Sequence, residues 1–148
     1  MDETTPKLLP ETTPTPRRPN LLTILCILTF IGSGMNLLSS LVIAGFYDEF
    51  VILAQEFGEK FNLPGMELIM EAKPVFFLTS AIGYAIAITG AILMMKLKKT
   101  GFHIYTIAQI LLILVPMYFF HMTGPSMLDI ILSGTFVLLY GVNLKIMS

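Results

Sequence analysis

Four long runs of apolar residues, separated by short polar segments, constrain this chain more than any other feature of its sequence. The first run, from Leu21 to Tyr47, contains no charged residue, and a helix of this length can cross a hydrocarbon core of about 30 Å with some tilt. Hydrophobic residues make up 55% of the chain and charged residues only 13%, whereas about a quarter of the residues in soluble domains are charged. The sequence therefore predicts an all-α membrane protein, an antiparallel four-helix transmembrane bundle. The expected spans are 21–47, 74–95, 102–121 and 127–144.

Two segments outside the spans differ in composition. Residues 1–20 are rich in proline and threonine and contain almost nothing to bury, so we expect a disordered cytoplasmic tail. The outer loop, 48–73, carries six acidic residues and two lysines. Its apolar residues recur at helical spacing, which predicts an amphipathic helix that either covers the bundle or docks a partner or ligand. These residues are Phe50, Leu53, Ala54, Phe57 and Phe61.

Basic residues gather in the segments that face one side of the membrane. They are Arg17 and Arg18 before the first run, Lys96, Lys98 and Lys99 between the second and third, and Lys145 after the fourth. Because positively charged loops tend to stay in the cytoplasm, this pattern predicts that both ends of the chain are cytoplasmic. Gly101 follows the lysines and is expected to permit a tight reversal between the second and third spans.

Small and polar residues recur at helical spacing on three of the runs. In the second run, Gly83, Ala87 and Gly90 form a face that lets helix backbones approach closely in lipid. We expect this face, and the polar stripe of the first run, to be buried against neighbouring helices. The stripe of the first run is Cys26, Thr29, Ser33, Asn36 and Ser40, and a similar stripe in the fourth run is Asp129, Ser133, Phe136, Tyr140 and Asn143.

Three polar side chains within the runs are candidates for a function. Asn36 and Gln109 lie deepest, and each is expected to be buried against a different neighbour, although a polar constriction on a permeation path is the alternative. Asp129 is the only carboxylate in a run. Ser126 and Asp129 fit a capping box at a helix start, while an intramembrane acid is also a functional candidate, so both interpretations of Asp129 are kept.

The sequence contains no pattern typical of a catalytic, cofactor or metal site. His103 and His121 lie on one predicted helix about 27 Å apart, at opposite membrane faces, so they cannot hold the same metal ion. The single cysteine, Cys26, is expected to be a small buried side chain. Three neighbouring lysines make no surface for nucleic acid. We therefore expect a protein that is not an enzyme and has no cofactor, whose partners are the lipid bilayer and either itself or another membrane protein.

Two stretches carry a resemblance to known proteins. They are the basic turn Met95-Lys96-Leu97-Lys98-Lys99-Thr100-Gly101-Phe102-His103-Ile104-Tyr105, followed by Ala108-Gln109, and the later stretch Leu139-Tyr140-Gly141-Val142-Asn143-Leu144. Together they resemble small uncharacterised four-span membrane proteins of bacteria. The resemblance covers the four runs and excludes the tail. It implies the four-span architecture and a bacterial inner membrane, and it brings no activity and no site residue.

Two functions fit this pattern. The leading hypothesis is a non-enzymatic membrane protein that acts by associating with itself or with a partner, because small-residue faces and an acidic outer segment occur without catalytic groups. The alternative is a small oligomeric transporter or channel for a solute or ion. Its path would be lined by Asn36, Gln109 and the polar stripe of the fourth run.

Overall fold

The computed structural model describes residues 19–62, 70–121 and 126–148, and within these residues all regular secondary structure is helical. The elements are α1 (Asn20–Gly45), α2 (Tyr47–Phe61), α4 (Pro74–Met95), α5 (Lys99–Phe120), α6 (Met127–Val142) and the 3-10 helix η1 (Asn143–Ile146). Four helical segments are long and apolar enough to cross a membrane: α1, α4, α5 and Met127–Ile146. The predicted fold class, an all-α membrane protein with four spans and a helical loop after the first, is confirmed. The tail at 1–18, with Arg17 and Arg18, lies outside the described residues, as do 63–69 and 122–125.

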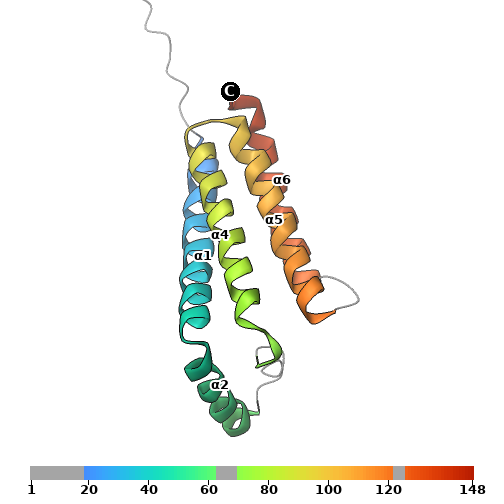
Figure 1. Ribbon diagram of the computed structural model, residues 1–148. Helices are drawn as coiled ribbons and strands as arrows, with labels where there is room; N and C mark the ends of the chain where they lie inside the picture. The colour runs from blue at the N-terminus through green and yellow to red at the C-terminus, as the bar shows by residue number, and fades with distance from the viewer. Residues whose placement is uncertain (1–18, 63–69, 122–125) are drawn as a thin grey trace, which may run out of the picture.

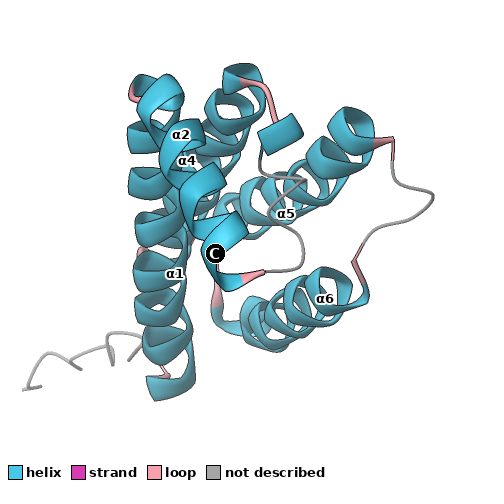
Figure 2. Cartoon of the chain, turned by 90° about the horizontal axis from the view of Figure 1, so that it is seen from below, coloured by secondary structure: helices cyan, strands magenta, loops and turns pink. Residues whose placement is uncertain are grey.

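The four spans are not packed equally against one another. Helix α4 packs along its length against α1 on one side and α5 on the other, whereas α6 lies beside α5 and contacts α1 only sparsely. Figure 1 shows α1 and α4 side by side and α6 next to α5. In Figure 2, which shows the molecule from below, α6 lies next to α5 and apart from α1.

The two ends of the bundle differ in charge. One end, which we call the lysine end, holds the start of α1, the α4–α5 turn with Lys96 and Lys98, and Lys145 in η1 (Figure 1). The other, the α2 end, holds α2 and the start of α4. At the lysine end the last residue of the sequence pairs with the turn, since Ser148 N–H donates to the Leu97 carbonyl (2.8 Å) and Lys99 N–H donates to the Ser148 carbonyl (3.0 Å).

A hydrophobic core cluster fills the half of the bundle nearer the lysine end, while Phe77, Ala81 and Val115 are buried toward the α2 end. It combines residues of all four spans, and Tyr140 of α6 is among the largest fully buried side chains. No α6 residue before Tyr140 is buried. The bundle is therefore closed by four helices at the lysine end and by three, α1, α4 and α5, toward the α2 end. The members of this core are Leu22, Leu25, Cys26, Ala87, Ala91, Met94, Tyr105, Ala108, Tyr140 and Met147.

The small residues of α4 allow its close contacts. Gly83, Ala87 and Gly90 are all buried, as their spacing predicts. A methyl group added at Gly83 would lie 2.7 Å from Leu112 Cδ2 of α5, so the neighbouring helix already fills that space. In lipid, where apolar side chains gain little by leaving the tails, such close approach supplies much of the packing energy.

The tightest contact in the bundle is the crossing of α4 and α5 at Gly90 and Gly101. A Cβ atom added at Gly101 would lie 2.6 Å from both Gly90 O and Met94 N, so the two backbones touch. This corrects the expectation that Gly101 makes the reversal possible. The residue with positive φ in the turn is Leu97 (φ 58°), and α5 already begins at Lys99, so Gly101 lies in its first turn as a packing residue.

At the α2 end, aromatic rings join the helices. Phe77 of α4 packs against Tyr47 and Phe50 at the start of α2, with ring centroids 6.5 and 6.4 Å apart. The Tyr47 hydroxyl donates to the Ala72 carbonyl at 2.7 Å. Beyond this first turn, α2 extends past the end of α1 (Figure 1), and its apolar residues are mostly exposed. Only Ala54 of α2 is buried, so this helix does not cover the bundle.

Candidate functional site

A network of polar side chains closes the bundle in the half nearer the lysine end. Thr29 of α1 and Tyr140 of α6 share a hydrogen bond of 2.8 Å between their hydroxyl oxygens. The ring of Tyr105 packs edge-on against that of Tyr140, with centroids 4.9 Å apart. Cys26 is buried, as expected, and its Sγ lies 3.6 Å from the Ala91 carbonyl oxygen to which it donates. Every polar group here is used in holding helices together.

The same face of α1 is open toward the α2 end. Thr29 is buried against α6, but Gly32 and Asn36, one and two turns further along, are exposed. The Asn36 amide donates to the Gly32 carbonyl of its own helix at 2.8 Å and reaches no other helix. The expectation that Asn36 is buried within the bundle is therefore wrong for the single chain. The reason is that α6 has diverged from α1 at this depth, although Ser33 and Ser40 of the same helix are buried.

Gln109 joins α5 to α6. The Ser133 hydroxyl donates to Gln109 Oε1 at 2.8 Å, and both side chains are half-buried. Gln109 thus bonds a neighbouring helix, whereas Asn36 bonds only its own. Together with the Thr29–Tyr140 bond, this bond ties α6 to the other spans.

A small cavity lies beside this bond. It has a volume of about 160 Å³ and opens between α4, α5 and α6. Polar groups from all three helices border it, together with Pro116, whose ring removes one backbone hydrogen bond from α5. The lining residues are Tyr84, Gln109, Leu112, Ile113, Pro116, Asp129 and Ser133.

Asp129 belongs to this cavity more than to a helix cap. Ser126 occupies the N-cap position of α6 and Asp129 the first turn, as the capping box predicts, but Ser126 makes no side-chain cap bond. The Asp129 carboxylate instead borders the cavity with Tyr84 and Ser133. Sequence reasoning did not single out Tyr84. A signal existed, because Tyr84 and Gln109 lie near the middle of two antiparallel helices and so at similar depth.

The chemistry available at this polar cavity is limited. It offers oxygen atoms of a carboxylate, an amide and two hydroxyl groups, without a paired nucleophile and base. Within the described ranges, no group of three or more His, Cys, Asp and Glu side chains converges on a point where it could hold a metal ion. Its volume is below the roughly 300–1,000 Å³ typical of small-molecule sites. The arrangement can order water, accept an ion or receive a side chain from another helix.

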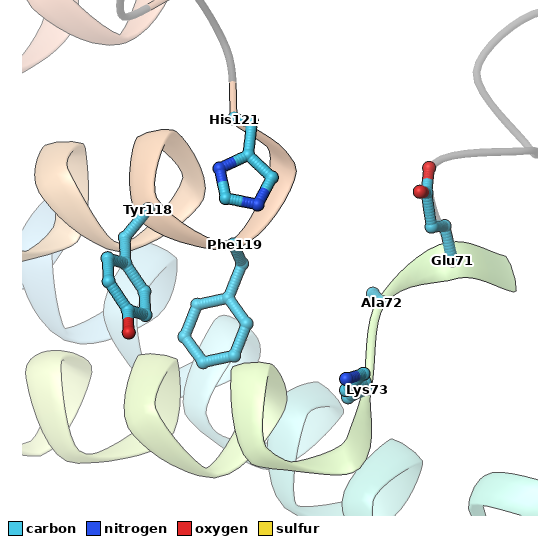
Figure 3. A pocket seen from close by; sticks show the side chains of 6 residues that line it. All are labelled: Glu71, Ala72, Lys73, Tyr118, Phe119 and His121. Carbon is cyan, nitrogen blue, oxygen red and sulfur yellow. The ribbon is translucent and has the colours of Figure 1, made fainter.

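A larger cavity, not anticipated from the sequence, lies at the α2 end. It measures about 390 Å³ and is lined by charged residues from the segment before α4 and by aromatic residues from the end of α5 (Figure 3). His121, the C-cap of α5, has a left-handed backbone (φ 47°) and turns its ring over this space. Its lining residues are Glu71, Ala72, Lys73, Tyr118, Phe119 and His121.

Comparison with protein-family models, with curated proteins and with solved structures finds no significant match for this chain. Any functional assignment therefore depends on its own residues and their geometry.

Proposed function

We propose that this chain is a non-enzymatic membrane protein that acts by associating with another transmembrane helix, from a second copy or from another membrane protein. The observation that supports this proposal is the opening between α1 and α6 toward the α2 end. There the face of α1 that is buried at Thr29 continues as Gly32 and Asn36, which no helix of residues 19–62, 70–121 and 126–148 covers.

The residues along this opening have the properties of a helix-packing surface. A Cβ atom added at Gly32 would meet nothing within 4 Å, in contrast to Gly83, Gly90 and Gly101, whose space is filled. Gly32 and Asn36 are four residues apart and therefore adjacent on α1, so a close-packing glycine lies next to an amide. An approaching helix would gain both backbone contact at the glycine and a hydrogen bond at the amide.

Contact with lipid alone is energetically unfavourable for the polar groups at this opening. The Asn36 amide oxygen accepts no bond from the described residues, and Asp129 is an exposed carboxylate in the first turn of a span. Polar groups facing hydrocarbon are costly, and membrane proteins usually turn them toward the bundle interior or a partner. A partner helix in the opening would remove this cost, which is the physical reason for proposing assembly.

The test is replacement of Asn36 by Leu, with assembly measured by multi-angle light scattering in mild detergent and by cross-linking in liposomes. The expected effect is a fall of about three- to thirtyfold in the association constant, the equivalent of about 0.6–2 kcal/mol for one interhelical polar contact. Thr89→Val is the matched control, because Thr89 is also exposed and also bonds a carbonyl four residues back on its own helix. A wild-type chain that is monomeric and co-purifies with no membrane protein would contradict the proposal.

A second candidate function is an oligomeric path for a small ion or solute. The observation in its favour is that Gln109, Asp129 and Ser133 border one cavity within the spans. If several copies assemble around the opening, these groups and Asn36 would line a polar route. Gln109→Leu in liposomes separates the two functions: lost ion flux with assembly intact favours the path, and absence of flux in both wild type and variant excludes it.

The proposed setting is the inner membrane of a bacterium, with the lysine end in the cytoplasm. Support comes from the gathering of Lys96, Lys98, Lys99 and Lys145 at one end of the bundle, which the positive-inside rule assigns to the cytoplasm. Acidic residues are concentrated at the other end, in α2 and at Glu71.

A further inference from the structure

We propose that the cavity at the α2 end, with an adjoining apolar groove on the outside of α4 and α5, binds one glycerophospholipid that has a zwitterionic ethanolamine headgroup. The cavity would hold the phosphate and the ammonium group, and the groove an acyl chain. This inference is independent of the proposed assembly, because none of the residues that carry it lies on the opening between α1 and α6.

The cavity is a built feature with fixed walls. On one side, the Tyr47 hydroxyl holds the Ala72 carbonyl at 2.7 Å and so fixes the segment between Glu71 and Lys73. On the other side, Phe119 packs edge-on against Phe76 of α4, with centroids 5.6 Å apart. Figure 3 shows these two sides facing each other across the cavity, with His121 above. Its volume of about 390 Å³ lies within the range of small-molecule pockets.

The charges of the cavity match those of a zwitterionic headgroup. Lys73 offers ammonium donors and His121 an imidazole N–H to a phosphate, while the Glu71 carboxylate is an acceptor for a primary ammonium group. Within the described residues, none of these three side chains forms an ion pair or a hydrogen bond with another side chain. The cavity therefore contains both positively and negatively charged side chains that do not pair with each other. They are available to bind a ligand that has a positive and a negative group.

The apolar part of a lipid has a place next to this cavity. A groove of about 340 Å³ on the outside of α4 and α5 is lined almost entirely by apolar side chains. Tyr118 and Phe119 line both the cavity and the groove, so the two adjoin at these rings. From Tyr118 to Leu111 the groove follows α5 for about 10 Å toward the middle of the membrane. Its residues are Thr79, Leu111, Leu114, Val115, Tyr118 and Phe119.

Aromatic residues at this level favour a lipid over a water-soluble zwitterion. The Tyr118 side chain is 78% exposed and comes from the last turn of α5, where a ring with a polar edge is suited to the headgroup region. The Tyr118 ring has the charged cavity on one side and the apolar groove on the other. This arrangement matches a lipid, in which a charged headgroup adjoins an apolar acyl chain. A soluble amine with a phosphate or carboxylate would fill the cavity and leave the groove empty.

The test uses the full chain, purified in detergent, depleted of lipid and incubated with phosphatidylethanolamine or phosphatidylglycerol, with bound lipid counted by native mass spectrometry. Wild type is expected to retain one phosphatidylethanolamine in preference to phosphatidylglycerol. Lys73→Ala should lower its retention about tenfold, as expected for loss of one charge-assisted bond. Lys60→Ala, at an exposed lysine of α2 outside the cavity, is the matched control and should retain the lipid like wild type.

Two further variants test the headgroup and the chain separately. Glu71→Gln should abolish the preference for phosphatidylethanolamine, because the carboxylate that receives the ammonium group is gone. Thr79→Phe should reduce retention of both lipids by filling the groove. Equal retention of the two lipids by wild type, or unchanged retention in Lys73→Ala, would overturn the proposal. Unchanged retention in Thr79→Phe would overturn the acyl-chain site. Circular dichroism and a monodisperse elution profile verify that each variant is folded.

Discussion

Asn36 and Gln109 bring the same amide group into the middle of two spans, yet their surroundings differ. Gln109 accepts a hydrogen bond from Ser133 of α6 at 2.8 Å, whereas Asn36 donates to its own helix and faces an opening. Residue type and depth predict that both are polar groups needing a partner. Among the described helices, Gln109 finds a partner on a neighbour and Asn36 does not, because α6 stays close to α5 but moves away from α1. The position of α6 results from the packing of the whole bundle, so neither residue predicts it alone.

The glycines show the same contrast and allow a quantitative prediction. Gly101→Ala would place a Cβ atom 2.6 Å from Gly90 O and Met94 N, both backbone atoms that cannot rotate away. The expected loss in unfolding free energy is about 1–3 kcal/mol, the usual cost of overpacking. It is measured by reversible denaturation with sodium dodecyl sulfate in mixed micelles.

Gly32→Ala is the control for this substitution. Its new methyl group would meet nothing within 4 Å, so the single chain should lose no stability and should gain up to about 1 kcal/mol from the higher helix propensity of alanine. Equal stability losses for the two variants would show that the contact between α4 and α5 at Gly101 is not the source of the effect.

At the scale of elements, the hydropathy of the chain and the spacing of its small residues predict most of the fold. The features they do not predict depend on contacts between helices. The apolar runs predict all four spans, and the small-residue face of α4 is buried as expected at Gly83, Ala87 and Gly90. The polar stripe of the fourth span is buried only at its end, at Tyr140 and Asn143, because α6 separates from α1 along its length. The cavity at the α2 end could not be predicted, since it brings together Lys73 and Tyr118 from segments that are distant in sequence.

The sparse packing of α6 predicts that its first half opens more readily than the other spans. Residues 127–138 contain no buried side chain, whereas α4 buries residues along its whole length. Local openings that cost about 1.4 kcal/mol less would raise amide hydrogen exchange about tenfold. Exchange measured by mass spectrometry on the monomer in detergent should therefore be faster in peptides from 127–138 than in peptides from α4.

A partner in the opening would reduce this difference. If assembly covers the inner face of α6, peptides from 127–138 should be protected in the assembled fraction, while the exchange of α4 should hardly change. Equal protection of α4 and α6 in the monomer would contradict the view that α6 is loosely held.

At the scale of the whole molecule, one half of the bundle is closely packed and the other is loosely packed. The lysine end combines the four-helix core, the Gly90–Gly101 crossing and the pairing of Ser148 with Leu97 and Lys99. The α2 end has three packed helices, an aromatic cluster and two cavities. The sites proposed for a partner helix and for a lipid therefore lie in the part of the molecule with the least packing, while the lysine end fixes the relative positions of the spans.

This division gives a direct test of orientation. Lys98→Cys and Lys145→Cys place thiols at the lysine end, and Glu59→Cys places one on exposed α2 at the other end. With the lysine end in the cytoplasm, a maleimide that cannot cross the membrane should label only Glu59→Cys in right-side-out membrane vesicles and only the two lysine-end variants in inverted vesicles. The wild-type chain is the control, because its sole cysteine, Cys26, is fully buried and should stay unlabelled in both. Labelling of Lys98→Cys and Glu59→Cys from the same side would refute the four-span topology, and the opposite pattern of labelling would reverse the orientation, placing the lipid cavity in the cytoplasmic leaflet.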